Sequence, residues 1–153
     1  MKAFFSCLML LTFLAAQTLT TKYGKIEVPE KVEKSFQTKY PKHTEAIWDD
    51  LGDLFLVTFY DVGELLKEAT FDLDGNWKET LTSFEESEMP HIMATFIEKK
   101  YGEDVEVFEV VFLENPAESF YSVVIEVNTE TEEEESESTT LIFDKNGNFL
   151  KVE

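Results

Sequence analysis

Two nearly identical heptapeptides constrain the fold of this chain more than any other feature. The first, FDLDGNW, runs from Phe71 to Trp77, and the second, FDKNGNF, runs from Phe143 to Phe149. An aspartate and a glycine between aromatic residues are typical of a three-residue hairpin turn that glycine closes in the left-handed region. This turn pairs Phe71 with Trp77 and Phe143 with Phe149 on one face of a sheet. We therefore expect all four aromatic side chains to be core.

A helical pattern of the same design precedes each heptapeptide. Val28–Pro41 and Met89–Gly102 each have a proline near the start, apolar residues at helical spacing, and a Pro or Gly at the end. The expected apolar stripes are Val28, Val32, Phe36 and Tyr40 in the first segment, and Ile92, Met93, Phe96, Ile97 and Tyr101 in the second. The segments align at an offset of 61 (93 − 32), whereas the heptapeptides align at an offset of 72 (143 − 71). The second half therefore carries about eleven extra residues, for which the acidic stretch Glu130–Ser138 is the obvious candidate.

The segments around and between the helices read as strands. They are rich in aromatic and β-branched residues and are separated by glycine-containing turns. The expected strands are 46–48, 53–61, 65–73, 76–84, 105–113, 120–128, 140–144 and 148–152. Their short loops exclude parallel crossovers. The sequence thus predicts an α+β fold made by tandem duplication of a helix plus a three-to-four-stranded antiparallel unit. Repeats 28–84 and 89–153 would form one domain, 28–153, with a single curved antiparallel sheet and both helices on one face.

The N-terminal residues have the features of a secretory signal. Lys2 is followed by the uncharged apolar run Ala3–Ala16, which is too short to span a bilayer comfortably and ends in small residues. We expect a signal peptide at 1–16, a flexible segment at 17–27, and export to the periplasm or beyond. Cys7 is the only cysteine and lies inside this run. The mature protein would therefore have neither disulfides nor cysteine metal sites.

The charge of the chain limits its partners. It contains 32 acidic residues and 13 basic ones, and every basic residue is lysine. Such a surface repels phosphate backbones, so nucleic acid is not an expected partner, nor is membrane insertion after signal cleavage. Any partner is expected to be cationic or apolar.

Motifs that carry chemistry are lacking. Asp72–Gly75 could suggest a calcium loop, but the ladder of ligands that an EF-hand needs does not follow it, and a structural turn is the better interpretation. His43 and His91 are far apart in sequence and are expected at the surface. The run Glu130–Glu137 is expected to be a solvated loop, with weak divalent-ion binding as the alternative. No nucleophile, phosphate-loop or dinucleotide motif is present, so we assign no catalytic, cofactor or metal residues.

One hairpin predicts a partner-binding surface. If Val62-Gly63 is a two-residue turn, Phe59 faces Leu66, and Phe55, Val57, Phe59 and Leu66 lie on the face opposite Phe71. An apolar cluster on a face without helices would be a protein-binding patch, which Phe108, Val110 and Phe112 would extend in the second half. The alternative is that the register is shifted by one residue and both faces are partly covered. The patch predicts that replacing Phe55 and Phe59 with serine leaves the melting temperature nearly unchanged.

These features together resemble a known family. Two copies of a P…F…Y pattern, the tryptophan of AIWDD (Ala46–Asp50) and the closing hairpins are similar to the PepSY-like family. These are secreted proteins of Bacteroidota whose fold is similar to the β-lactamase inhibitor protein. The resemblance covers about Val28–Glu153 and implies two α-β repeats that share one curved sheet with a concave open face. It implies no catalytic residues. The inhibitor is disulfide-bonded, and this chain departs from it there.

Two classes of function are compatible with the sequence. The favoured one is a non-enzymatic periplasmic binding module that engages a protein or peptide through the open face of its sheet. In one form of this hypothesis the bound protein is an enzyme, which the module inhibits. The alternative is a protein that binds a small ligand or a divalent cation, such as calcium, through its acidic surface.

The signal peptide gives a first prediction. Expression in a Gram-negative host should yield a mature chain that begins at Gln17 in the soluble periplasmic fraction, because the apolar run is short and a polar segment follows it. N-terminal sequencing checks this, and an intact Met1 in the membrane fraction would contradict it.

Overall fold

The computed structural model describes residues 26–102, 105–127 and 138–153. The predicted signal peptide and the segment Glu130–Glu137 lie outside the described residues and remain predictions. The elements in chain order are α1 (Glu30–Lys39), β1 (Thr44–Asp50), β2 (Leu54–Tyr60), β3 (Leu66–Asp72), β4 (Trp77–Phe84), the 3-10 helix η1 (Glu86–Glu88), α2 (His91–Tyr101), β5 (Val105–Glu114), β6 (Ser119–Val127), β7 (Ser138–Asp144) and β8 (Phe149–Val152).

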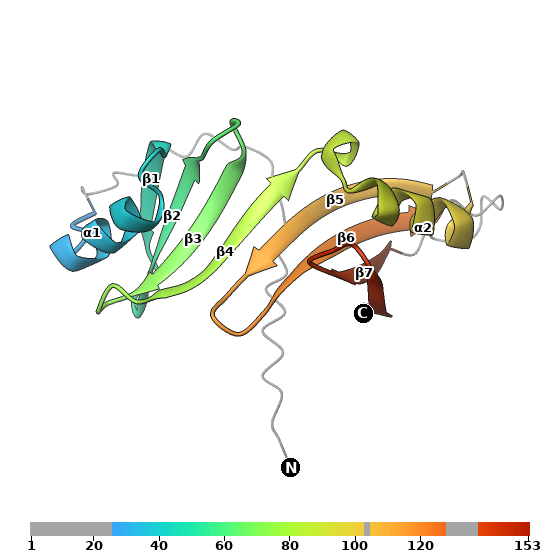
Figure 1. Cartoon of the computed structure of the whole chain (residues 1–153). Helices are drawn as coiled ribbons and strands as arrows, with labels where there is room; N and C mark the ends of the chain where they lie inside the picture. Colours follow the sequence, from blue (N-terminus) through green and yellow to red (C-terminus); the bar gives the residue numbers. More distant parts are fainter. Residues whose placement is uncertain (1–25, 103–104, 128–137) are drawn as a thin grey trace, which may run out of the picture.

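The strands form one antiparallel sheet in which each strand pairs with its neighbours in chain order. α1 lies at the end formed by β1–β3, and α2 lies at the end formed by β5–β7 (Figure 1). Paired residues of neighbouring strands lie on the same face of the sheet. The pairs that connect Lys67 on β3, through Thr82 and Phe112, with Phe143 on β7 therefore lie on one face, the face toward the helices. Both helices therefore cover the same face. The α+β class and the single antiparallel sheet are confirmed, and the described residues contribute eight strands to it. The duplication of the sequence remains an inference from the paired motifs.

Both helices begin directly after a proline, as predicted. Pro29 and Pro90 have extended backbone conformations and each carbonyl accepts the first hydrogen bonds of its helix. Apolar residues four apart then bury one face of each helix: Val32 and Phe36 in α1, Met93 and Ile97 in α2. The predicted stripe of the second helix is wrong at one position. Ile92 was expected in the core, but its side chain is 49% exposed.

The core consists of two clusters, one under each helix. In the first, Phe36 of α1 is the central side chain, and its ring lies 5.0 Å from the ring of Phe59 and 5.2 Å from that of Trp48. In the second, Met93 and Ile97 pack against β5, β6 and β7. The fully buried members of the two clusters are Val32, Phe36, Val57, Phe59, Ala69 and Phe71 in the first, and Met93, Ile97, Val110, Val123, Ile125, Leu141 and Phe143 in the second. Phe71 and Phe143, the first aromatics of the two heptapeptides, are core as expected, whereas Trp77 and Phe149 are only half-buried and pack against the clusters.

The predicted register between β2 and β3 is wrong by one residue. The turn contains three residues, Val62–Glu64, because Gly63 and Glu64 both take positive φ angles and the amide of Asp61 donates to the carbonyl of Leu65. Tyr60, and not Phe59, therefore pairs with Leu66. Because side chains alternate between the faces of a strand, this shift of one residue exchanges the two faces of β2.

The shift places three aromatic and aliphatic residues in the core. Phe55 pairs with Phe71, and Phe55, Val57 and Phe59 are at most 4% exposed under α1. The expectation that Phe55 and Phe59 form an exposed patch is therefore wrong, and the unchanged melting temperature expected on their replacement no longer follows from it.

Burial of Phe59 predicts a large loss of stability on truncation. Phe59→Ala should lower the free energy of unfolding by about 3–5 kcal/mol, because it removes a buried ring and leaves a cavity beside Phe36. Leu66→Ser, at a position 36% exposed on the other face, should cost less than about 1 kcal/mol. Urea denaturation of both variants measures the difference, and equal losses would contradict this placement of Phe59.

Candidate functional site

The candidate site is the face of the sheet that carries no helix, here called the open face. Strand pairing identifies the residues on it, since paired residues point to the same side. One row of paired residues crosses this face from β1 to β7 and consists of Ile47, Thr58, Glu68, Leu81, Leu113, Phe120 and Asp144.

The middle of this row is apolar. Leu81, Leu113 and Phe120 are consecutive on the central strands β4, β5 and β6, and each is half-buried. Val111 and Ile142 lie in the neighbouring row, separated by Ser122. When one face of an antiparallel sheet packs on a core, the other is commonly polar. An apolar centre on the helix-free side is therefore a candidate contact surface. We call Leu81, Val111, Leu113 and Phe120 the central patch, and leave out Ile142, which is only 5% exposed.

Acidic residues surround the central patch. The acids that pairing places on the open face are Asp49, Glu68, Asp72, Glu79, Glu106, Glu109, Glu126 and Asp144. Lys151 is the one lysine that the described strands place there by pairing. Burial raises the pKa of the Glu68 carboxyl, and the charge of Asp49 raises it further. The face therefore has a negative potential that favours cationic groups.

Most of the predicted partner-binding residues lie on the other side of the sheet. Phe55, Val57, Phe59 and Val110 are core residues that pack beneath the helices. Phe112 also faces the helix side, where its ring lies 4.5 Å from the ring of Tyr121. These five cannot contribute to the open face.

The two remaining predicted residues are exposed. Leu66 lies on the open face, beside Tyr60, and is 36% exposed. Phe108 is 55% exposed because it lies in a bulge of β5, where the pairing shifts between Val107 and Glu109. Both remain predicted partner-binding residues. The central patch itself was missed. Alternation from Trp77 along β4 would place Leu81 on the helix side, and only the shift in pairing between Thr70–Glu79 and Phe71–Trp77 turns it to the open face.

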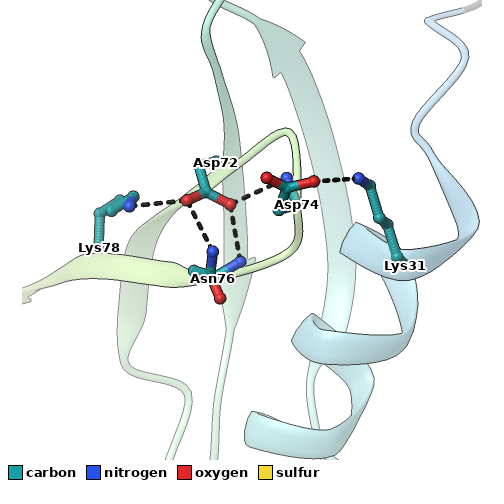
Figure 2. Close-up of polar contacts among 5 residues, drawn as sticks. All are labelled: Lys31, Asp72, Asp74, Asn76 and Lys78. Atoms are coloured by element: carbon teal, nitrogen blue, oxygen red, sulfur yellow. Dashed lines mark hydrogen bonds and ion pairs between the residues drawn. The ribbon is translucent and has the colours of Figure 1, made fainter.

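The heptapeptide turns are built as predicted. In the first, the amide of Asp72 donates to the carbonyl of Asn76, and Gly75 takes a φ of 81°. Figure 2 shows the Asp72 carboxylate at the centre of the turn, accepting hydrogen bonds from Asp74 and Asn76 and pairing with Lys78. The second turn repeats the hydrogen bonds around Asp144, which accepts from Asn146 and Asn148.

These contacts explain the acidity of the two aspartates. The Lys78 ammonium and the Asn76 amide hold the pKa of Asp72 well below its usual range. Asn148 lowers the pKa of Asp144 in the same way. The oxygens of Asp72 already bind groups of the turn, so the turn presents no set of free ligands to an ion. Among the described residues, no three His, Cys, Asp or Glu side chains are grouped as metal ligands.

The histidines differ from each other. His91 is exposed, as expected. His43 is half-buried, with Nδ1 2.6 Å from the carbonyl oxygen of Tyr40 and its ring 4.4 Å from that of Phe36. The expectation of a surface position is wrong for His43, which packs on the first core cluster.

The fold defines a class of proteins with one open antiparallel sheet and two helices on one side. Three solved structures share it. A BLIP-like protein of Bacteroides fragilis is 24% identical with a TM-score of 0.69, and the match covers 85% of this chain and 88% of that chain. A DUF2874 family protein of Bacteroides ovatus is 20% identical with a TM-score of 0.65, covering 84% and 89%. A protein of Bacteroides eggerthii described as a "putative periplasmic protein" is 15% identical with a TM-score of 0.63, covering 83% and 88%.

The family assignment comes from the sequence match. The family described as "putative beta-lactamase-inhibitor-like, PepSY-like" matches residues 54–151. This chain therefore belongs to the PepSY-like family. No curated protein matches it significantly. Within the described residues, no helix has the length and apolar character needed to cross a membrane.

The Asp72 turn predicts a stability that depends on pH. A carboxyl whose pKa is lowered in the folded state stabilises that state above its unfolded pKa, and the contribution is lost as the pH falls through the folded pKa. Asp72→Asn should therefore lower the melting temperature at pH 7, and the difference from the parent should shrink below about pH 4.

Thermal unfolding from pH 7 to pH 2 measures this effect. Asp53→Asn, which removes one exposed charge outside the turn, is the matched control. A difference between Asp72→Asn and the parent that stays constant down to pH 2 would contradict the assigned role of Asp72.

Proposed function

We propose that this protein is a non-enzymatic periplasmic binding module that holds a protein or peptide on the open face of its sheet. The central patch carries this proposal, since Leu81, Leu113 and Phe120 form a continuous apolar strip on the side without helices. The periplasmic location rests on the predicted signal peptide and on the similar protein of Bacteroides eggerthii that is described as periplasmic.

The chemistry of the open face defines the partner. An apolar centre surrounded by acids suits a partner that inserts apolar side chains and places Lys or Arg around them. Glu68 and Asp144 lie at the two ends of the apolar strip, within the same row of paired residues. A cationic group paired with Glu68 would stabilise its charged form, which is disfavoured in the free protein by burial and by Asp49.

Enzyme inhibition is one form that such binding can take. The family description refers to β-lactamase inhibitors, and a similar structure is described as BLIP-like. An inhibitor acts by covering an active site with a rigid surface, and the paired central strands offer one. A panel of β-lactamases assayed with and without the protein tests this form of the proposal separately from binding itself.

Binding of a divalent cation is the alternative function. The described residues give it no specific support, because the Asp72 carboxylate is engaged within its own turn. The acidic run Glu130–Glu137 lies outside the described residues. We therefore keep the open face as the proposed site.

A negative charge introduced into the central patch tests the proposal. Leu113→Asp should weaken the binding of a basic amphipathic peptide at least about tenfold, because the variant places a carboxylate where an apolar side chain inserts. Val62→Asp is the matched control, since Val62 is 63% exposed in the β2–β3 turn and lies away from the patch. Titration calorimetry with a peptide that alternates Lys and Leu gives both affinities.

Two results would contradict the proposal. One is equal affinity of Leu113→Asp and Val62→Asp at equal melting temperature. The other is a peptide affinity that disappears entirely at high salt for the parent protein, which would show binding by charge alone. Photo-crosslinking from position 81, followed by mapping of the linked residues, locates the contact on the sheet.

A further inference from the structure

A groove lies between α1 and the β3–β4 hairpin, on the opposite side of the sheet from the open face. It has a volume of about 700 Å³. α1 lines it with Lys34, Ser35 and Lys39, and the hairpin lines it with Gly75 and Trp77. The half-buried indole of Trp77 is its largest aromatic surface.

The corresponding position under α2 is filled. There the ring of Phe96 stacks on that of Phe149, with centroids 4.4 Å apart and planes at 15°. Phe96 also meets the edge of the Phe143 ring at 5.5 Å. The Lys100 ammonium lies 4.7 Å from the centre of the Phe149 ring. An aromatic side chain of the helix therefore occupies the space beside this hairpin.

Ser35 replaces that aromatic side chain in α1. The helix alignment at an offset of 61 places Ser35 opposite Phe96 (96 − 35), and the hairpin alignment at 72 places Trp77 opposite Phe149 (149 − 77). The contacts of the glycines agree with this alignment at one position, since Lys31 and Ile92 are 61 residues apart (92 − 31). A Cβ on Gly75 would meet Lys31 and Ser35 of α1, and one on Gly147 would meet Ile92 and Met93 of α2. The groove is therefore the space left by a missing ring.

A lysine side chain covers the half-buried indole of Trp77. The Lys39 ammonium lies 3.6 Å from the centre of the Trp77 ring, closer than Lys100 lies to Phe149. A lysine at this position is long, exposed and able to move. When a ring enters the groove, the Lys39 ammonium can leave the indole face and pair with an anionic group.

The groove is also basic, in a chain whose net charge is −19. Lys31, Lys34 and Lys39 line it, and Asp74 is the one acid among its lining residues. Figure 2 shows Lys31 reaching from α1 to pair with Asp74. An anionic ligand is therefore attracted to this part of the surface and repelled by most of the rest.

We propose that this groove binds an aromatic carboxylate, whose ring stacks on Trp77 where Phe96 stacks on Phe149 and whose carboxylate pairs with Lys34 and Lys39. The site is separate from the open face and does not depend on the function proposed for it. The ligand has two sources with the same chemistry, a free aromatic acid or the C-terminal aromatic residue of a peptide.

Tryptophan fluorescence measures the binding. In a Trp48→Phe background Trp77 is the sole tryptophan of the chain, and 3-phenylpropionate does not absorb at the excitation wavelength of indole. We expect a saturable change in emission with 3-phenylpropionate, and binding about three- to tenfold weaker with 3-phenylpropionamide, which lacks the charge. The tripeptide Gly-Gly-Phe and its C-terminal amide form the second pair of probes. Tighter binding of the tripeptide than of the free acid assigns the site to a peptide terminus, and the reverse assigns it to a free acid.

Two variants test the groove itself. Ser35→Phe places in α1 the residue that α2 has, so it should keep or raise the melting temperature and abolish saturable binding. Lys34→Gln combined with Lys39→Gln should reduce the affinity for 3-phenylpropionate to that for its amide. Lys42→Gln combined with Lys99→Gln removes the same charge at two other exposed lysines and should leave the affinity unchanged.

The proposal is overturned by any of three results. These are the absence of saturable binding by both acids, equal affinity for each acid and its amide, and unchanged binding by a folded Ser35→Phe variant. If Ser35→Phe does not fold, the two double lysine variants still decide the matter, because equal affinities for 3-phenylpropionate in both would exclude the groove.

Discussion

The pairing of β4 with β5 is the interaction on which the rest of the structure depends. Each half of the chain has its own helix and its own core cluster, and pairs from Thr80–Glu114 to Phe84–Val110 join them into one sheet. Because this pairing keeps the helix-facing sides aligned, the opposite side becomes one continuous surface from β1 to β7. The pair Leu81–Leu113, at the centre of the central patch, belongs to this junction. The candidate binding surface is thus a product of joining the halves.

The two halves of the structure have similar elements, but the space between helix and hairpin is filled by side chains in only one of them. In the second half the rings of Phe96, Phe143 and Phe149 pack against one another and close the space beside the hairpin. In the first half Ser35 leaves this space open, and the Trp77 indole instead donates to Thr80 Oγ1 at 2.8 Å. Burial of apolar area is the main source of stability in a domain without disulfides. A serine at a position where a phenylalanine would pack buries less apolar area and so stabilises the domain less. Such an omission fits a position where access to the ring has a use.

The distribution of charge separates the two candidate surfaces. Acids surround the central patch of the open face, whereas lysines of α1 line the groove on the helix side. A strongly acidic chain can form a basic site only by grouping its few lysines, and α1 carries three of them at the groove. The two surfaces therefore favour ligands of opposite charge, and one ligand class is not expected to bind at both.

The sequence by itself determined the elements, the class and the two heptapeptide turns of this protein. Prolines and four-residue apolar spacing placed both helices, and the heptapeptides placed Phe71 and Phe143 in the core because an Asp-to-Gly turn has few alternatives. The sequence could not determine which face of β2 is buried. Leu54, Leu56 and Tyr60 alternate with Phe55, Val57 and Phe59, so both faces are apolar and periodicity gives no preference. The tertiary structure decided it through the positive φ of Glu64, which adds one residue to the turn and turns Phe59 toward Phe36. The tertiary structure also determines the central patch and the groove. Each is formed by residues of several elements, and only strand pairing and helix packing bring these residues together.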